Sequence, residues 1–365
     1  MELIWWIDHL GVGGSQKRLI QLVTALSSHV PQQAIVCLNS VVQPDTRKLL
    51  NSCGVEIRVL GKWKLLTGVG LISTWWWLRR KPTYTSITFL FFSDVIGILL
   101  SRMTGAKKII SSQVGRNSHY SPSQEWILKK ILTLTQSVVL NAKCLRKSLQ
   151  RYLPIDANIK IIRNGINLDD PLIGNNDIGI RQSLGVSADT KLIGSIGRLA
   201  PEKSLATLVC ALSRIDRSDI HVVLVGTGDQ RAFLEKLSIR LGVDRRIHFL
   251  GYRSNVYEVL KQIDVYVQAS LYEGMPNAVM EAMAVACPVI ATSVDGNVEL
   301  LGDNHCGWLF KPQDSCALAA CINSVVDNPR ESAIRSTRAM TRLLADYTEQ
   351  QMIVKWKTLL EFPDP

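Results

Sequence analysis

Two glutamates, Glu273 and Glu281, stand eight residues apart and flank a Gly-Met-Pro-Asn turn. The turn follows an apolar run at 265–269 that is typical of a buried strand, and Pro276 suits the start of a helix. Amides of such a loop and of a helix N-terminus bind anions, whereas carboxylates accept hydrogen bonds from hydroxyls. The segment therefore suits a nucleotide-sugar, which carries both groups. The alternative is a surface loop before a helix in which Glu281 is solvated.

A pair of cations follows another predicted strand, at 191–196. The connection Gly197-Arg-Leu-Ala-Pro-Glu-Lys203 supplies Arg198 and Lys203, and fixed cations stabilise the charge that develops on a departing diphosphate. Alternatively, Arg198 pairs with a carboxylate and Lys203 is a solvated residue at a helix start. The sequence contains no Asp-x-Asp motif. We therefore expect no metal and no cofactor, with the two cations in place of an ion.

Together these segments resemble retaining glycosyltransferases of the GT-B fold, in particular glycosyltransferase family 4. The run from Glu273 to Glu281 resembles the family's Glu-x7-Glu signature, and 197–203 resembles its Gly-Arg-Leu-x-x-x-Lys segment. The resemblance implies that Glu273 lies at the donor sugar and that Glu281 binds the ribose. It also implies a diphosphate clamp of Arg198 and Lys203. Further donor contacts are implied for Gly274, Met275, Pro276 and Asn277.

Other segments resemble the same family. Gly13-Gly14 corresponds to its glycine turn, which implies a donor contact for Gly14 and an acceptor contact for Gly13. The run Phe249–Arg253 resembles the nucleobase segment, which implies donor contacts for Tyr252 and Arg253. After the fifth predicted strand, His119 is a candidate catalytic residue and Arg116 a candidate contact of an acceptor phosphate. A lone histidine is, however, more often structural.

Predicted strands and helices alternate almost throughout, which is typical of open parallel sheets. A length of 365 residues indicates two domains. The predicted strands are 2–7, 33–38, 55–60, 84–89, 107–112, 137–140 and 159–162, then 191–196, 220–225, 246–249, 264–268 and 288–292. The resemblance implies an α/β GT-B chain with two Rossmann-like domains facing across a cleft. These are an acceptor domain at 1–165, a nucleotide-sugar domain at 166–347, and a C-terminal helix within 348–365 that returns to the first domain.

Charge is unevenly distributed, with +15 on residues 1–165 and −4 on the remainder. The basic half carries Trp5, Trp6, Trp63 and the run 75–77 beside lysines and arginines, a composition typical of binding to an anionic membrane surface. Alternatively, the run 75–77 faces the core and the cations are solvated. We expect no nucleic-acid partner, because no nucleic-acid-binding motif occurs. Eight scattered cysteines favour a reduced cytoplasmic compartment, and we expect neither signal peptide nor membrane span.

The resemblance, together with these observations, implies a retaining, metal-independent hexosyltransferase. It would move a sugar from a UDP- or GDP-sugar to a lipid-linked or glycolipid acceptor in surface polysaccharide or lipopolysaccharide biosynthesis. We expect it in the cytoplasm, peripheral on the inner face of the cell membrane. The alternatives are a nucleotide-sugar epimerase, which acts without an acceptor, and a phosphorylase, which needs free phosphate. A non-catalytic nucleotide-binding or membrane-scaffold module is the third.

Overall fold

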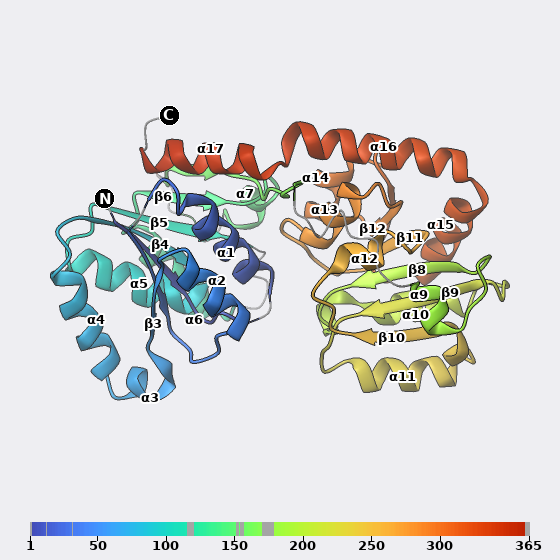
Figure 1. Cartoon of the computed structure of the whole chain (residues 1–365), viewed down its shortest axis with the longest axis horizontal. Coiled ribbons are helices and arrows are strands. Elements are labelled where there is room, and N and C mark those ends of the chain that lie inside the picture. The colour runs from blue at the N-terminus through green and yellow to red at the C-terminus, as the bar shows by residue number, and fades with distance from the viewer. Residues whose placement is uncertain are drawn as a thin grey trace. The chain divides into compact units, whose positions relative to one another are not determined.

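The computed structural model describes residues 2–11, 13–30, 32–114, 120–150, 153, 157–169 and 179–361. The chain divides into two compact units, Met1–Arg163 with Ile353–Pro365 and Asn164–Met352. Each unit has a parallel β-sheet with helices on its faces (Figure 1). The predicted α/β class with two parallel sheets is therefore confirmed.

The sheet of the first unit has seven strands in the order β3-β2-β1-β4-β5-β6-β7. Because the strand order reverses between β1 and β4, their carboxyl ends flank the position where open parallel sheets bind ligands. Both strands are buried along their whole length, and β1 is apolar from Leu3 to Ile7, whereas β4 also buries Thr85, Ser86 and Thr88. The strands are β1 (Glu2–Ile7), β2 (Gln33–Cys37), β3 (Glu56–Val59), β4 (Tyr84–Phe89), β5 (Lys108–Gln113), β6 (Ser137–Leu140) and β7 (Ile159–Ile161).

Helices connect these strands and cover the sheet. One of them, α6, begins with a capping box in which Ser121 and Gln124 each bind the other's backbone N–H. Leu78 of α4 and Tyr84 of β4 share a buried core with Trp6. The helices are α1 (Gly14–Leu26), α2 (Pro44–Ser52), α3 (Gly61–Leu66), α4 (Val69–Arg79), α5 (Phe91–Met103), α6 (Pro122–Leu132) and α7 (Leu145–Ser148).

The two tryptophans of β1 point to opposite faces of the sheet. A Cβ on Gly97 of α5 would lie 2.8 Å from the Trp6 ring, and the Trp5 ring centroid lies 6.3 Å from that of Trp356. Both tryptophans are fully buried. Counting Trp5 and Trp6 toward a membrane surface was therefore wrong, because β1 is a central strand with both faces covered.

Residues near the C-terminus complete the first unit. Helix α17 (Glu349–Leu360) carries Trp356 against Trp5, and the Lys108 ammonium donates to the Leu359 carbonyl at 2.7 Å. Lys357 also lies against His29, with 2.6 Å between Nζ and Nε2. The part of the helix from Ile353 onward thus groups with the first unit.

The second unit has six strands in the order β10-β9-β8-β11-β12-β13. Its order reverses between β8 and β11. Helices α10, α11 and α15 cover one face around Leu208, Leu234 and Leu318. The strands are β8 (Lys191–Ile196), β9 (Ile220–Val225), β10 (Ile247–Gly251), β11 (Val265–Gln268), β12 (Val289–Thr292) and β13 (Trp308–Phe310).

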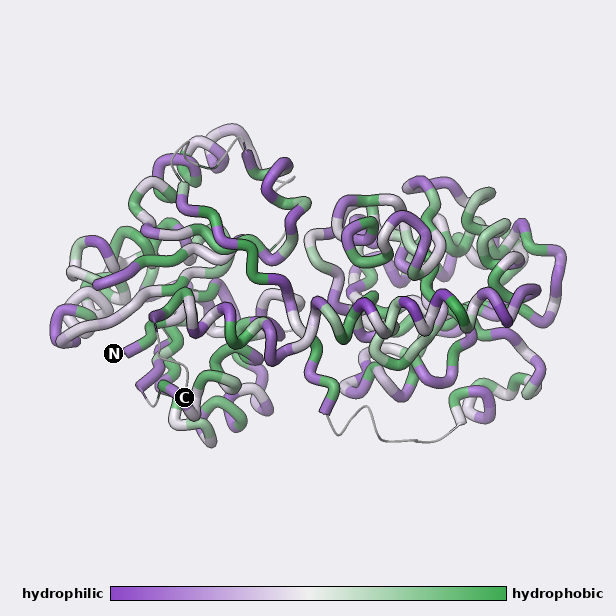
Figure 2. Tube along the Cα trace, turned by 90° about the horizontal axis from the view of Figure 1, so that it is seen from above, coloured by the Kyte–Doolittle hydropathy of each residue, from purple (hydrophilic) through white to green (hydrophobic). Residues whose placement is uncertain are grey.

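The longest helix of the second unit is α16 (Pro329–Asp346), which packs on α13. Figure 2 shows hydrophilic and hydrophobic residues alternating along it, and its buried side includes Ala339 and Leu343. The other helices are α9 (Ile180–Leu184), η1 (Pro201–Lys203), α10 (Leu205–Leu212), α11 (Arg231–Arg240), η2 (Asp244–Arg246), α12 (Val256–Leu260), α13 (Asn277–Ala284), α14 (Asp295–Leu301) and α15 (Ser315–Asp327). Within the described ranges, no helix is both long and apolar enough to cross a bilayer.

Candidate functional site

A pocket opens at the carboxyl ends of β8 and β11, the strands between which the order of the second sheet reverses. Open parallel sheets bind ligands at this position. The two loops that leave these strands carry the predicted diphosphate clamp and the first glutamate of the predicted signature. The pocket is lined by Ser195, Ile196, Gly197, Arg198, Lys203, Leu205, Gln268, Ala269 and Ser270.

Lys203 and Glu273 form an ion pair beside this pocket. The Lys203 ammonium lies 2.6 Å from Glu273 Oε1, and the side chains are 27% and 12% exposed. Lys203 is the last residue of η1, which holds its backbone in a tight turn. Two residues predicted for adjacent roles, one at the diphosphate and one at the sugar, are thus in direct contact.

Gln268 orients Glu273 from the last position of β11. Its side-chain amide donates to Glu273 Oε1 at 2.5 Å and to the Ser270 hydroxyl at 2.9 Å. The Tyr266 hydroxyl in turn donates to the Gln268 side-chain carbonyl. Burial raises the pKa of Tyr266 well above its usual value, and the nearby Glu273 and Glu281 raise it further. Tyr266 therefore remains a phenol donor, and the hydrogen bonds run from Tyr266 through Gln268 to Glu273.

Sequence reasoning missed Gln268. Its signal is a polar residue at the end of the otherwise apolar, fully buried strand β11. A buried polar side chain needs hydrogen-bond partners, so its position at a strand's carboxyl end points to a supporting role at a site.

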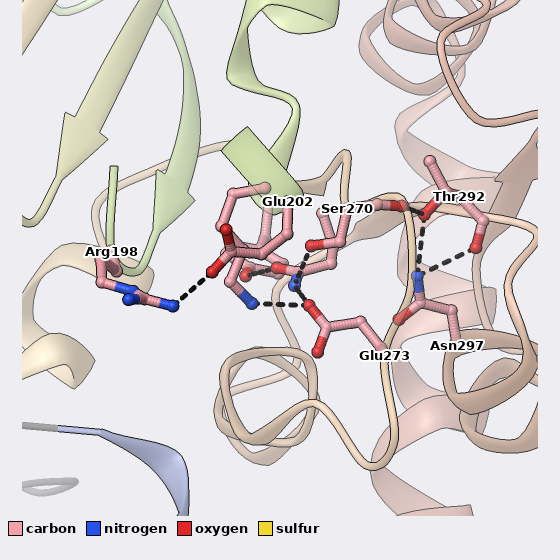
Figure 3. Close-up of polar contacts among 9 residues, drawn as sticks. Arg198, Glu202, Ser270, Glu273, Thr292 and Asn297 are labelled. Atoms are coloured by element: carbon pink, nitrogen blue, oxygen red, sulfur yellow. Dashed lines mark hydrogen bonds and ion pairs between the residues drawn. The ribbon is translucent and has the colours of Figure 1, made fainter. Parts of the chain in front are cut away.

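Arg198 has a different environment from the one that the diphosphate clamp implies. Its guanidinium pairs with Glu202 four residues later, and its side chain is 71% exposed (Figure 3). This contact matches the alternative interpretation, in which Arg198 pairs with a carboxylate. Exposed pairs contribute only about 0–1 kcal/mol, so an entering anion could replace Glu202 at small cost in free energy.

The turn between the two glutamates is largely buried. Gly274, Met275 and Pro276 are buried, and Asn277 accepts a hydrogen bond of 3.0 Å from the Asn164 amide. Pro276 is the N-cap of α13 rather than its first residue. Glu281 is only 5% exposed, so the alternative of a solvated glutamate does not hold.

Two glycines allow backbone to pack on backbone around the pocket. A Cβ on Gly226, after β9, would lie 1.9 Å from the Gly197 carbonyl oxygen. A Cβ on Gly296, in α14, would lie 1.9 Å from the Gly274 carbonyl oxygen. Any side chain at either position would displace a loop that carries predicted site residues.

The turn around Gly274 has further support from β12 and α14. Thr292 donates at 2.6 Å to the carbonyl of Ser270, and the buried Asn297 amide donates at 2.9 Å to the carbonyl of Thr292 (Figure 3). These bonds join the loop after β11 to the neighbouring strand. The loop after β11 that carries Glu273, here called the glutamate loop, is therefore held by hydrogen bonds from both β11 and β12.

Tyr252 and Arg253 follow β10 at the sheet edge. Strand β9 separates them from β8, and both side chains are exposed. They lie at the same end of the sheet as the other predicted donor residues, because all these residues follow carboxyl ends of parallel strands.

The remaining predicted residues belong to the first unit. Gly13 is the N-cap of α1 and Gly14 is its first residue. A Cβ on Gly13 would meet the Gln16 side chain at 2.2 Å, and the Gln16 amide lies 3.3 Å from His9 Nε2. Arg116 and His119 lie outside the described residues.

Sequence reasoning also missed a buried polar cluster at the carboxyl ends of β1, β4 and β5. The carboxylate of Asp8 accepts from the Ser93 N–H and hydroxyl at 2.8 and 2.7 Å. Asp94, in the first turn of α5, accepts from Ser111 at 2.8 Å and from the Gln113 amide at 2.7 Å. Burial raises the pKa of Asp94 to about 6, against the lowering effect of these hydrogen bonds. The cluster lies where the order of the first sheet reverses.

Known proteins resemble this chain in sequence and in fold. Residues 177–341 match the family of glycosyl transferases group 1. An uncharacterized glycosyltransferase of Methanocaldococcus jannaschii is 30% identical over 240 residues, 63% of this chain and 62% of that protein. The chain thus spans less than two thirds of that relative's length.

Two further relatives align over nearly their full length. N-acetylgalactosamine-N,N'-diacetylbacillosaminyl-diphospho-undecaprenol 4-alpha-N-acetylgalactosaminyltransferase of Campylobacter jejuni is 22% identical over 357 residues, 93% of this chain and 94% of its own. The crystal structure of Anabaena HepE in complex with UDP-glucose is 20% identical, with a TM-score of 0.84 over 99% of each chain. The chain therefore has the GT-B fold, and its residues 177–341 are similar to the glycosyl transferases group 1.

Proposed function

We propose that the protein is a retaining glycosyltransferase of family 4 that transfers a hexose from a nucleotide-sugar. The observation that carries the proposal is the contact between Lys203 and Glu273, supported by Gln268, at the switch point of the second sheet. One cation and one oriented carboxylate at this position match a ligand with a diphosphate beside a sugar. The Anabaena structure contains UDP-glucose, which makes a UDP-sugar the first donor to test.

The diphosphate of the donor would bind at the mouth of this pocket, between the loops after β8 and β11, because the pocket itself has a volume of only about 10 Å³. Lys203 and Arg198 would bind the diphosphate, and the amides from Gly274 to Asn277 would bind phosphate and sugar hydroxyls. Glu273 would orient the sugar. Glu281 would bind the ribose hydroxyls, and the backbone at Tyr252 and Arg253 would hold the base.

In the transfer step, the bond between the anomeric carbon and the diphosphate oxygen breaks. The acceptor oxygen then forms its bond on the same face, and its proton passes to the departing phosphate. Charge on the leaving group grows during this step, so fixed cations lower the barrier. Lys203 and Arg198 take this role, and no metal is required.

The acceptor is proposed to be lipid-linked, in surface polysaccharide or lipopolysaccharide assembly. The Campylobacter jejuni relative is named for a diphospho-undecaprenol acceptor and aligns with 93% of this chain. The net charge of +15 on residues 1–165 suits a phosphorylated lipid at an anionic membrane surface. These considerations support a peripheral protein on the inner face of the cell membrane.

Thermal unfolding with UDP- and GDP-sugars tests donor binding. A ligand at 100 times its dissociation constant stabilises the protein by about 2.7 kcal/mol. Product analysis with an undecaprenyl-diphosphate sugar then separates the candidate reactions. Transfer with retained anomeric configuration supports the proposal. A changed sugar without acceptor indicates an epimerase, and dependence on free phosphate indicates a phosphorylase. Absence of any stabilisation across the panel would contradict a nucleotide-sugar donor.

A further inference from the structure

Helices α3 and α4 expose a row of large apolar side chains, Trp63, Leu66, Val69, Ile72 and Trp76, which we name the α3–α4 ridge. Each of these side chains is between 56% and 85% exposed. Apolar side chains of this size rarely gather on a surface without a partner. The proposed donor site does not account for this exposed row of apolar side chains.

The geometry of α4 accounts for this exposure. Gly70, Thr74 and Leu78 are buried on the inner face, and Trp77 packs on the core of the first unit. Val69, Ile72 and Trp76 are spaced by three and four residues, so they share the opposite face. Gly70 holds α3 close, because a Cβ there would lie 3.0 Å from the Lys64 Cβ. The ridge is therefore an outward face on a well-packed support.

Exposed cations flank the ridge residues in the sequence, and acids are absent from this segment. Residues 57–93 contain the exposed Lys62, Lys64, Arg79 and Arg80 but no aspartate or glutamate. Arg79 also lies 5.3 Å from the Trp75 ring centroid, whereas Lys81, which lies over Trp77, is paired with Glu2 at 2.6 Å and does not contribute to this charge. Tryptophan and aliphatic side chains within a basic rim match the boundary between headgroups and acyl chains in an anionic bilayer.

A groove adjoins the ridge at the carboxyl ends of β2 and β3. It has a volume of about 620 Å³, and its lining includes Asn39, Ser40, Lys62, Trp63 and Lys64. Trp63 therefore belongs to both the ridge and the groove. If the ridge lies in the lipid interface, the adjoining groove, with Lys62 and Lys64, would lie at the level of the headgroups.

We infer that the α3–α4 ridge docks the protein on an anionic lipid bilayer, with Trp63 and Trp76 in the interface and Lys62 and Lys64 against lipid phosphates. The inference deepens the proposed function, on which it rests for the lipid-linked acceptor. A second copy of the chain is the less suitable occupant, because it would bring an equally basic rim against this one.

Vesicle flotation tests the inference with the full chain. The probes are vesicles of phosphatidylcholine alone and of equimolar phosphatidylcholine and phosphatidylglycerol. We expect binding to the second kind only. Each cation near an anionic surface contributes about 1 kcal/mol, so Lys62→Gln with Lys64→Gln should weaken binding about tenfold to thirtyfold. Trp63→Ser with Trp76→Ser should weaken it at least tenfold.

The second unit provides matched controls on α11. Phe233 and Ile239 are exposed apolar residues, and Lys236 and Arg240 are exposed cations. Phe233→Ser with Ile239→Ser, and Lys236→Gln with Arg240→Gln, should float as the unchanged protein does. All variants replace exposed side chains, and unchanged thermal unfolding shows that they fold.

Three results would overturn the inference. They are equal binding to both vesicle types, ridge variants that bind as well as the α11 controls, and a dimer in sedimentation that Trp63→Ser with Trp76→Ser dissociates. Stabilisation by a UDP-sugar is measured on the same samples. If that stabilisation persists while vesicle binding fails, only the ridge assignment is lost. If vesicle binding persists without any nucleotide-sugar effect, only the proposed function is lost.

Discussion

Lys203 and Glu273 lie 70 residues apart in the chain, yet their side chains meet with 2.6 Å between nitrogen and oxygen. The contact exists because β8 and β11 are neighbours in the sheet, although seven elements, η1, α10, β9, α11, η2, β10 and α12, lie between them along the chain. Under the proposed function, this pair would separate when a donor enters, with Lys203 on phosphate and Glu273 on sugar hydroxyls.

Arg198→Ala should lower turnover by about 10²–10³, the effect of removing one fixed donor that stabilises developing charge. Stability should hardly change, because Arg198 is 71% exposed and its ion pair with Glu202 is a surface contact. Steady-state kinetics and thermal unfolding of the same preparation measure both quantities. Glu202→Gln is the control, since it removes the partner but keeps the cation. Turnover equal to that of the unchanged protein would remove Arg198 from the diphosphate clamp.

Gln268→Leu should reduce turnover and destabilise the second unit. The substitution leaves the Tyr266 hydroxyl without its acceptor and Glu273 without one donor, and a buried unsatisfied group costs about 1–3 kcal/mol. Tyr266→Phe removes only the outer hydrogen bond and should have the smaller effect on turnover. Denaturant unfolding and kinetics distinguish the two. Equal loss of turnover in both variants would argue against an orienting role for Gln268.

Gly296→Ala should abolish donor binding, whereas alanine at the exposed neighbouring residue, Asp295, should leave donor binding unchanged. The added Cβ would lie 1.9 Å from the Gly274 carbonyl oxygen, so the glutamate loop must move. Asp295→Ala is the control, because Asp295 is exposed. Stabilisation by a UDP-sugar in thermal unfolding reports binding. Normal stabilisation of the Gly296→Ala variant would show that the loop can shift without affecting the site.

Asp94 should make the stability of the first unit depend on pH. Burial raises the pKa of Asp94 to about 6 in the folded state, whereas its ordinary pKa of 3.8 applies in the unfolded state. The folded state thus binds more protons between about pH 4 and 6, and stability falls as the pH rises through that window. The total contribution is about 3 kcal/mol. The free energy of unfolding of the protein and of Asp94→Asn, measured from about pH 4 to 6, isolates this contribution. If the protein gained stability relative to Asp94→Asn as the pH rises, the raised pKa would be contradicted.

Most strands of both sheets were predictable from sequence, because strands such as β1 and β9 are rich in the apolar and β-branched residues of buried parallel strands. Strand β13 (Trp308–Phe310) was not predicted. Composition also led to the wrong prediction that Trp5 and Trp6 contribute to a membrane-binding surface. Tryptophans beside cations suggest an interface, but the sequence does not show that β1 lies at the centre of a sheet.

The site was predictable only as separate segments. The runs that contain Lys203 and Glu273 were found from residue types and spacing, and the fold brings them together. A polar residue at the end of an apolar strand marks Gln268 locally, but the sequence does not show that Glu273 is its partner. Nor does it show the partners of Asp94, which come from β4 and β5.

The contact between Trp356 and Trp5 has a consequence for biosynthesis. Trp5 on β1 is translated long before its cover on α17, because the whole second unit lies between them in the chain. Domains generally fold in order of synthesis, N-terminal first. Here the first unit lacks part of its apolar cover until the helix after Ile353 is released. The first unit, whose synthesis begins before that of the second, is therefore completed only after the second unit has been synthesised.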